Sequence, residues 1–171
     1  MKDESSSADT PFWRFSLDFY RRPGVSDVCL ALQDDCGADV NLLLFLFWLA
    51  SDDRQLSADE VQMLEDNVRD WRRLAIAPLR DTRRRLKGAE TLIAPDKQEA
   101  FRAKVMAIEL EAERLQQEAL YEFTQSGPLG TPASPLAAAR ANVAVYQSVL
   151  GTGFPKPAAD RLIDAFEAMI A

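Results

Sequence analysis

Residues 40–50 form a run of apolar side chains that is interrupted only by Asn41. A helix needs about 20 apolar residues to cross a membrane, so this run is too short to span one. A helix that is apolar on every face must also be covered on every face. We therefore expect a buried helix at the centre of the domain and no association with a membrane.

Helix-boundary signals divide the rest of the chain into further helical segments. Thr10 and Pro11 combine an N-cap hydroxyl with a proline at the first helical position. Ser57 and Glu60 have the spacing of a capping box. No segment alternates apolar and polar side chains between turn signals, as a strand would. The sequence therefore predicts an all-α fold, a single-domain helical bundle of seven or eight helices.

The domain limits follow from composition. Residues 1–10 are polar and acidic, which predicts a disordered N-terminal tail. Residues 126–135 contain two glycines and three prolines and predict a loop. One helical domain is expected over residues 11–171, with a core at 11–125 and a less distinctive C-terminal helical part at 134–171.

The residue types that most enzymes use are missing or badly placed. The chain has no histidine, which removes the usual general base near neutral pH and the usual activator of a serine or cysteine nucleophile. Its two cysteines, Cys29 and Cys36, would lie about 10 Å apart on one helix, too far for a disulfide. We expect reduced thiols, a cytoplasmic location, no cofactor, no metal, and an adaptor or binding protein rather than an enzyme.

The main candidate for a binding surface is a basic segment in an acidic chain. Residues 69–87 contain eight basic and two acidic side chains, whereas the other residues contain 12 basic and 25 acidic ones. At 100° per residue, seven of the basic side chains fall within about 120° of one helix circumference. Pro78 predicts a kink or a break within this segment. The candidate partner-binding residues are Arg69, Arg72, Arg73, Arg80, Arg83, Arg84 and Lys87.

Two alternatives would neutralise this basic segment. Acidic residues of the same domain, such as Asp66, Asp70 and Asp81, lie three or four positions from several of the arginines. An acidic partner could do the same, since arginine binds a carboxylate through two parallel hydrogen bonds. A protein partner fits better than RNA, because the net charge of the chain is −7.

Asp66 and Asp70 also allow a chemical interpretation. Their carboxylates lie four residues apart on one helix face, where they could hold magnesium and a pyrophosphate. The alternative function is therefore a small-molecule or phosphate-ligand binding protein, in the extreme case a degenerate enzyme resembling isoprenoid synthases. Ion pairs with the neighbouring arginines explain the same two residues without a metal.

Residues 96–123 predict a long helix with heptad spacing. Its apolar seam consists of Phe101, Val105, Ile108, Ala112, Leu115 and Ala119. The seam could pair with another helix of the same chain in an antiparallel hairpin. It could instead pair with a helix of another molecule, which would make the protein an oligomer.

Several motifs carry a resemblance to a known family. They are Phe12-Trp13-Arg14-Phe15-Ser16-Leu17, Tyr20 with Pro23-Gly24-Val25, Cys29-Leu30-Ala31-Leu32-Gln33 with Asp34, Gly37-Ala38-Asp39-Val40-Asn41-Leu42-Leu43-Leu44, Trp48-Leu49-Ala50, Trp71, Pro78-Leu79-Arg80 and Arg83-Arg84. Over roughly residues 11–125 the chain resembles an uncharacterised proteobacterial protein family of similar length. The resemblance implies a bacterial, cytoplasmic, helical protein of unknown function, and it brings no catalytic residues.

The resemblance also draws attention to the loop between Gln33 and Asn41. Both side chains are polar and lie beside an apolar core segment. One interpretation is that they cap the two helices on either side of the loop. The alternative is that they line a small pocket together with Trp13 and Trp48.

Overall fold

The computed structural model describes residues 9–171, which divide into two compact units. One unit comprises the described residues up to Leu64 together with Gln117–Ala171, and the other comprises Glu65–Gln116. Most of the predicted disordered tail falls on residues 1–8, outside the described residues. The prediction of one domain over residues 11–171 stays a prediction.

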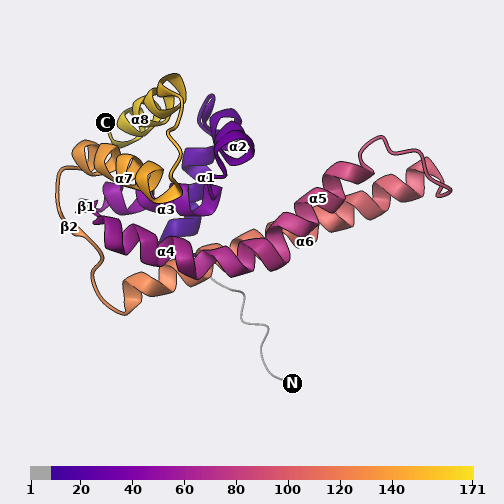
Figure 1. Ribbon diagram of the computed structural model, residues 1–171, viewed down its shortest axis with the longest axis horizontal. Helices are drawn as coiled ribbons and strands as arrows, with labels where there is room; N and C mark the ends of the chain where they lie inside the picture. The colour runs from indigo at the N-terminus through magenta and orange to yellow at the C-terminus, as the bar shows by residue number, and fades with distance from the viewer. Residues whose placement is uncertain (1–8) are drawn as a thin grey trace. The chain divides into compact units, whose positions relative to one another are not determined.

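Apart from turns and two short strands, the described residues are helical (Figure 1). The helices are α1 (Pro11–Tyr20), α2 (Val25–Cys36), α3 (Val40–Ser51), α4 (Ala58–Trp71), α5 (Ala77–Leu86), α6 (Pro95–Gln125), α7 (Pro135–Leu150) and α8 (Lys156–Ile170). A π-helical turn, Arg72–Ile76, joins α4 to α5, so the described residues contain seven continuous helical segments. The prediction of an all-α fold with seven or eight helices is confirmed.

Helix α3 lies at the centre of the first unit, as its apolar sequence predicts. It is buried on all sides, and aromatic rings of the helices around it pack against it. The ring centroids of Phe12 in α1 and Phe45 in α3 are 5.1 Å apart, and those of Phe47 in α3 and Phe166 in α8 are 5.3 Å apart. Such aromatic contacts add to the free energy gained by excluding water from the core.

A buried amide on α7 fixes the position of that helix in the first unit. The side-chain NH2 of Asn142 donates to the backbone carbonyls of Leu46 and Arg54, at 3.1 Å each. Its side-chain oxygen accepts a hydrogen bond from the backbone N–H of Leu56 at 2.8 Å. Because a buried amide without partners destabilises a fold, these bonds hold α7 in register with α3 and the strand that follows.

The predicted capping box at the start of α4 is confirmed. The backbone N–H of Ser57 donates to the carboxylate of Glu60 at 2.8 Å, and the backbone N–H of Glu60 donates to the hydroxyl of Ser57. Glu60 also accepts from the backbone N–H of Gly130 at 2.8 Å. Partial burial alone would raise the pKa of Glu60, but these hydrogen bonds from Ser57 and Gly130 lower it.

Two short strands, β1 (Arg54–Gln55) and β2 (Thr131–Pro132), form an antiparallel pair that the sequence did not predict. Gly130 makes the pair possible. Its φ is 70°, and a Cβ at this position would lie 2.7 Å from the carbonyl oxygen of Gln55. Only glycine combines this backbone conformation with so close an approach of two chain segments.

The second unit is a helical hairpin, residues 65–116, in which α5 and the first part of α6 run antiparallel (Figure 1). The indole N–H of Trp71 donates to the backbone carbonyl of Ala112 at 2.9 Å. Near the connecting loop, the side-chain amide of Gln98 donates to the carbonyls of Leu86 and Ala89. The helix of residues 96–123 therefore pairs within the chain in an antiparallel hairpin.

The irregularity expected at Pro78 takes the form of the π-helical turn directly before it. The backbone N–H of Ala77 donates to the carbonyl of Arg72, five residues earlier rather than four. In a regular α-helix the proline ring clashes with the carbonyl four residues earlier and leaves it without a donor. A π-helical turn re-routes the hydrogen bonds, so the helix continues through Pro78.

Candidate interaction surface

Polar side chains make up most of the inner face of the hairpin. Within residues 95–116, buried or half-buried α6 side chains recur at spacings of four and three, at Gln98, Arg102, Val105, Glu109, Ala112 and Gln116, and Glu113 and Arg114 are half-buried as well. Of the predicted apolar seam, Val105 and Ala112 are buried as expected. Phe101, Ile108 and Leu115 are exposed. The intramolecular seam therefore uses only part of the predicted heptad pattern.

Glu109 lies at the centre of this inner face and is only 5% exposed. One carboxylate oxygen accepts from the Nε of Arg80 at 3.1 Å, and the other accepts from the Nε of Arg83. Arg80 also donates to Glu113 at 2.7 Å. The hydrogen bond to Glu109 raises the pKa of the Arg83 guanidinium. A buried carboxylate is tolerated only when it is paired, and here the pairing holds α5 against α6.

Arg72, like Arg80 and Arg83, forms an ion pair with an acidic side chain of the hairpin. Its Nη2 lies 2.5 Å from the carboxylate of Glu65, which is buried. Three of the seven predicted partner-binding residues are therefore paired inside the hairpin. Their partners are all glutamates rather than the aspartates that the sequence suggested.

The remaining predicted basic residues lie at the surface. Arg69 pairs with Asp66 at 2.6 Å and Arg73 pairs with Asp70 at 3.3 Å, and all four side chains are at least half exposed. These two contacts are the ion pairs that internal neutralisation predicts. Arg84 and Lys87 are exposed as well. Arg85, which the sequence did not single out, pairs with Asp81 at 2.8 Å in a similarly exposed position.

The π-helical turn explains why the basic side chains do not form one ridge. A π-helical turn contains one residue more than an α-helical turn, so α5 is rotated by about 100° relative to a regular continuation of α4. Arg69, before the turn, and Arg73, near its start, both face solvent. After it, Arg80 and Arg83 face α6.

The hairpin also exposes many large apolar side chains. These are Trp71, Leu74, Leu92, Ile93, Phe101, Met106, Ile108, Leu110 and Leu115. Phe101, Ile108 and Leu115 are seven residues apart and therefore line one side of α6. Trp71 reaches the same side, because it contacts the Ala112 carbonyl one turn from Ile108.

Leu74 lies two residues after Arg72 and two before the buried Ile76, so its side chain points away from α6. We define the apolar face of the hairpin as Trp71, Phe101, Ile108 and Leu115. Met106 and Leu110 point to the opposite side of α6, because two residues correspond to about 200° of helical rotation.

The four residues suggested for a pocket occupy different environments. Asn41 is buried and accepts a hydrogen bond from the side-chain amide of Gln117, whose oxygen accepts from the hydroxyl of Ser16. The ring of Trp48 packs against Phe12, Phe45 and Tyr121. Trp13 is half-buried on α1.

The amide nitrogen of Gln33 is buried without a hydrogen-bond partner among the described residues. Gly37 and Asp39, rather than Gln33 and Asn41, cap the two helices, so the capping interpretation was wrong. A pocket formed by the four suggested residues stays a prediction.

Asp66 and Asp70 lie on the exposed side of α4 and each forms an ion pair with an arginine three residues later. Among the described residues there is no cluster of three or more acidic, cysteine or histidine side chains that could hold a metal ion. A magnesium or phosphate ligand at these two aspartates stays a prediction.

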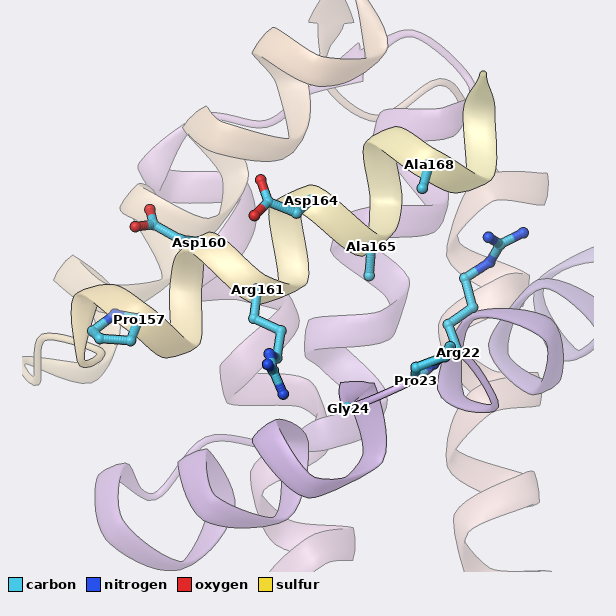
Figure 2. Close-up of a pocket in the computed structure, with 9 residues that line it drawn as sticks. All are labelled: Arg22, Pro23, Gly24, Pro157, Asp160, Arg161, Asp164, Ala165 and Ala168. Atoms are coloured by element: carbon cyan, nitrogen blue, oxygen red, sulfur yellow. The ribbon is translucent and has the colours of Figure 1, made fainter.

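A shallow cleft of about 520 Å³ lies between the start of α2 and helix α8 of the first unit. Figure 2 shows the side chain of Arg161 directed toward Gly24, while the guanidinium of Arg22 points away from it. Asp160 and Asp164 also line the cleft, so its charges are mixed. This arrangement selects neither an anion nor a cation.

Sequence reasoning missed Glu65, Glu109 and Glu113 as partners of the basic segment. Glu109 carried a usable signal, because it lies four residues after Val105 and three before Ala112 in the heptad pattern. A charged residue at such a position predicts an ion pair across the helix interface. Two of the basic residues one helix earlier are its partners.

None of the helices in the described part of the chain is both long and apolar enough to cross a membrane. The family model described as "Protein of unknown function (DUF2390)" matches residues 11–120, which is more than half of the chain. No curated protein and no solved structure matches the chain.

Proposed function

We propose that this chain, which belongs to the DUF2390 family of proteins of unknown function, is a non-catalytic interaction protein of the bacterial cytoplasm. Its helical hairpin binds an acidic protein partner through the exposed basic side chains of residues 69–87. The inner arginines serve a different purpose, since they hold the two helices of the hairpin together.

The observation that carries this proposal is the way the exposed arginines are paired. Arg69, Arg73 and Arg85 each contact an exposed aspartate three or four residues away on the same helix. Such pairs contribute roughly 0.3–0.5 kcal/mol each. The carboxylates of a partner can replace these aspartates with little loss, and arginine binds a carboxylate in a defined two-bond geometry.

The distribution of charge supports an acidic protein rather than a nucleic acid. The hairpin contains 12 basic and 10 acidic side chains, whereas the rest of the chain contains 8 basic and 17 acidic ones. A weakly positive element on an acidic protein attracts a local acidic patch. A long phosphate backbone would meet repulsion from the acidic remainder of the chain.

Affinity capture from a native bacterial lysate tests the proposal. The full-length chain is compared with Arg73→Glu/Arg84→Glu/Arg85→Glu at low and at high salt, with the captured proteins quantified by mass spectrometry. Arg80 and Arg83 are left unchanged, because a glutamate beside Glu109 would unfold the hairpin by burying like charges. We expect an acidic protein that binds the wild type at low salt and is lost both at high salt and in the variant.

A matched control separates the surface from net charge. Arg14→Glu/Arg21→Glu/Arg140→Glu makes the same change in charge at three exposed arginines outside the hairpin. This control is expected to capture the partner as the wild type does. If the two triple variants behave alike, or if only nucleic acid is captured, the proposal is wrong.

A further inference from the structure

The apolar face of the hairpin has the spacing of a helix-pairing surface. Phe101, Ile108 and Leu115 recur every seven residues and extend over about 21 Å of α6. Lys104 and Glu111 border this row, one turn before and one turn after Ile108. Both are exposed, and neither forms an ion pair within the part of the chain that the structure describes. Exposed apolar patches bordered by charges are typical of interaction sites.

We propose that this face binds a second copy of the chain, with the two α6 helices antiparallel and a two-fold axis passing beside Ile108. Ile108 then packs against Ile108 of the second copy. Phe101 lies opposite Leu115 of the second copy, because the two residues are equally far from the axis. Lys104 lies opposite Glu111 of the second copy, within about 2 Å along the helix axis, and the symmetry forms this ion pair twice.

The order of charges along α6 selects this arrangement. In a parallel pairing each residue would lie opposite itself, so Lys104 would face a lysine and Glu111 would face a glutamate. Like charges directly opposite each other weaken an interface, whereas the antiparallel pairing brings opposite charges together. Because Lys104 and Glu111 complement each other across a two-fold axis, this charge pattern favours a second copy of the chain over a different protein.

Sedimentation velocity of the full-length chain over a range of concentrations tests the proposal. The wild type is expected to form a dimer that dissociates on dilution. Ile108→Lys places two ammonium groups at the axis and is expected to raise the dissociation constant of the dimer at least about tenfold. Leu110→Lys is the matched control, since Leu110 is 50% exposed and Ile108 is 53% exposed, but Leu110 faces the opposite side of α6. Its dimer is expected to remain intact.

Charge reversal tests the orientation of the two helices. Lys104→Glu and Glu111→Lys are each expected to weaken the dimer several-fold, because each places like charges opposite each other. The double variant Lys104→Glu/Glu111→Lys restores the pair with its signs exchanged and is expected to recover wild-type affinity. Only the antiparallel pairing of α6 with α6 of the second copy predicts that the double variant recovers the affinity of the wild-type dimer.

A wild type that stays monomeric at all concentrations overturns the proposal, and so do equal effects of Ile108→Lys and Leu110→Lys. A dimer that the double charge reversal does not restore overturns the antiparallel arrangement. Circular dichroism of each variant shows whether it is folded. Loss of the dimer and loss of the acidic partner are distinguishable, because the two proposals use different side chains that are changed in different variants.

Discussion

Cys29 and Cys36 lie on the same helix, but burial makes their thiols chemically different. Cys29 is buried, and desolvation raises its pKa to about 12, whereas Cys36 is only partly buried. The thiolate is the reactive form of cysteine. We expect Ellman's reagent at pH 8 to label Cys36 quickly and Cys29 only when the protein unfolds. Cys36→Ser should remove the fast phase, and Cys29→Ser should retain it.

The same burial predicts how stability depends on pH. In the unfolded chain the Cys29 thiol ionises near its ordinary pKa of 9.0, whereas in the folded chain it stays protonated to about pH 12. The unfolded state therefore loses a proton that the folded state keeps. Between these values the free energy of unfolding should fall by about 1.4 kcal/mol per pH unit. Urea denaturation of the wild type and of Cys29→Ser from pH 8 to 11 measures the difference, and parallel curves would contradict it.

Alanine substitutions at Gly24 and Gly37 distinguish the cost of backbone strain from the cost of steric crowding. Both have positive φ, at 79° and 69°, but a Cβ at Gly24 would lie 2.7 Å from the Nη1 of Arg161, whereas a Cβ at Gly37 would meet nothing. We expect Gly37→Ala to lower the free energy of unfolding by about 1 kcal/mol, because alanine disfavours this conformation. Gly24→Ala should lower it further, and the double variant Gly24→Ala/Arg161→Ala should lack this additional loss relative to Arg161→Ala. Thermal unfolding of the three single variants and the double variant measures these free energies.

At the scale of secondary-structure elements, Glu109 decides whether α5 and α6 stay together. Removing this buried carboxylate leaves Arg80 and Arg83 without their shared partner in a partly buried position. Breaking such a pair is expected to lower the free energy of unfolding by about 3 kcal/mol. Asp66→Ala, which removes an exposed partner of Arg69, should change it by less than about 1 kcal/mol. Equal values for Glu109→Ala and Asp66→Ala in urea denaturation would contradict this assignment.

The elements that local chemistry determines were predictable from the sequence. The caps at Thr10 and Ser57 depend on neighbouring residues alone, and the central position of α3 follows from its apolar surface. The inner face of the hairpin was not predictable in the same way. Hydrophobic spacing favoured Ile108, but the ion pairs of Glu109 turn a different side of α6 inward.

The basic segment could be found from sequence, but its division into two groups could not. Counting charges identifies the arginines, and helical geometry assigns them all to one side. The π-helical turn changes that geometry. In the sequence, only the proline that follows at position 78 indicates an irregularity there. Arg69 and Arg80 therefore face different directions although their numbering places them on one side.

At the scale of the whole chain, the two units differ in what stabilises them. The first has an aromatic core around α3, whereas the hairpin is held by ion pairs and amide hydrogen bonds. Few buried apolar contacts allow a segment to open without global unfolding. In the Ile108→Lys variant, we expect peptides from residues 77–110 to exchange amide hydrogens well before those of α3. Identical rates in hydrogen-exchange mass spectrometry would show that the chain opens only as one cooperative unit.

The extra residue in the turn Arg72–Ile76 determines how α5 is rotated about its axis, so the orientation of α5 can be changed by changing the length of this turn. Deleting one residue there, for example Ala75, together with Pro78→Ala to remove the proline ring, would give a regular helix and rotate the rest of α5 by about 100°. Arg80 and Arg83 would then point away from Glu109, although every charged side chain of α5 is retained. The length of this turn, rather than the identity of the arginines, determines which of them face α6.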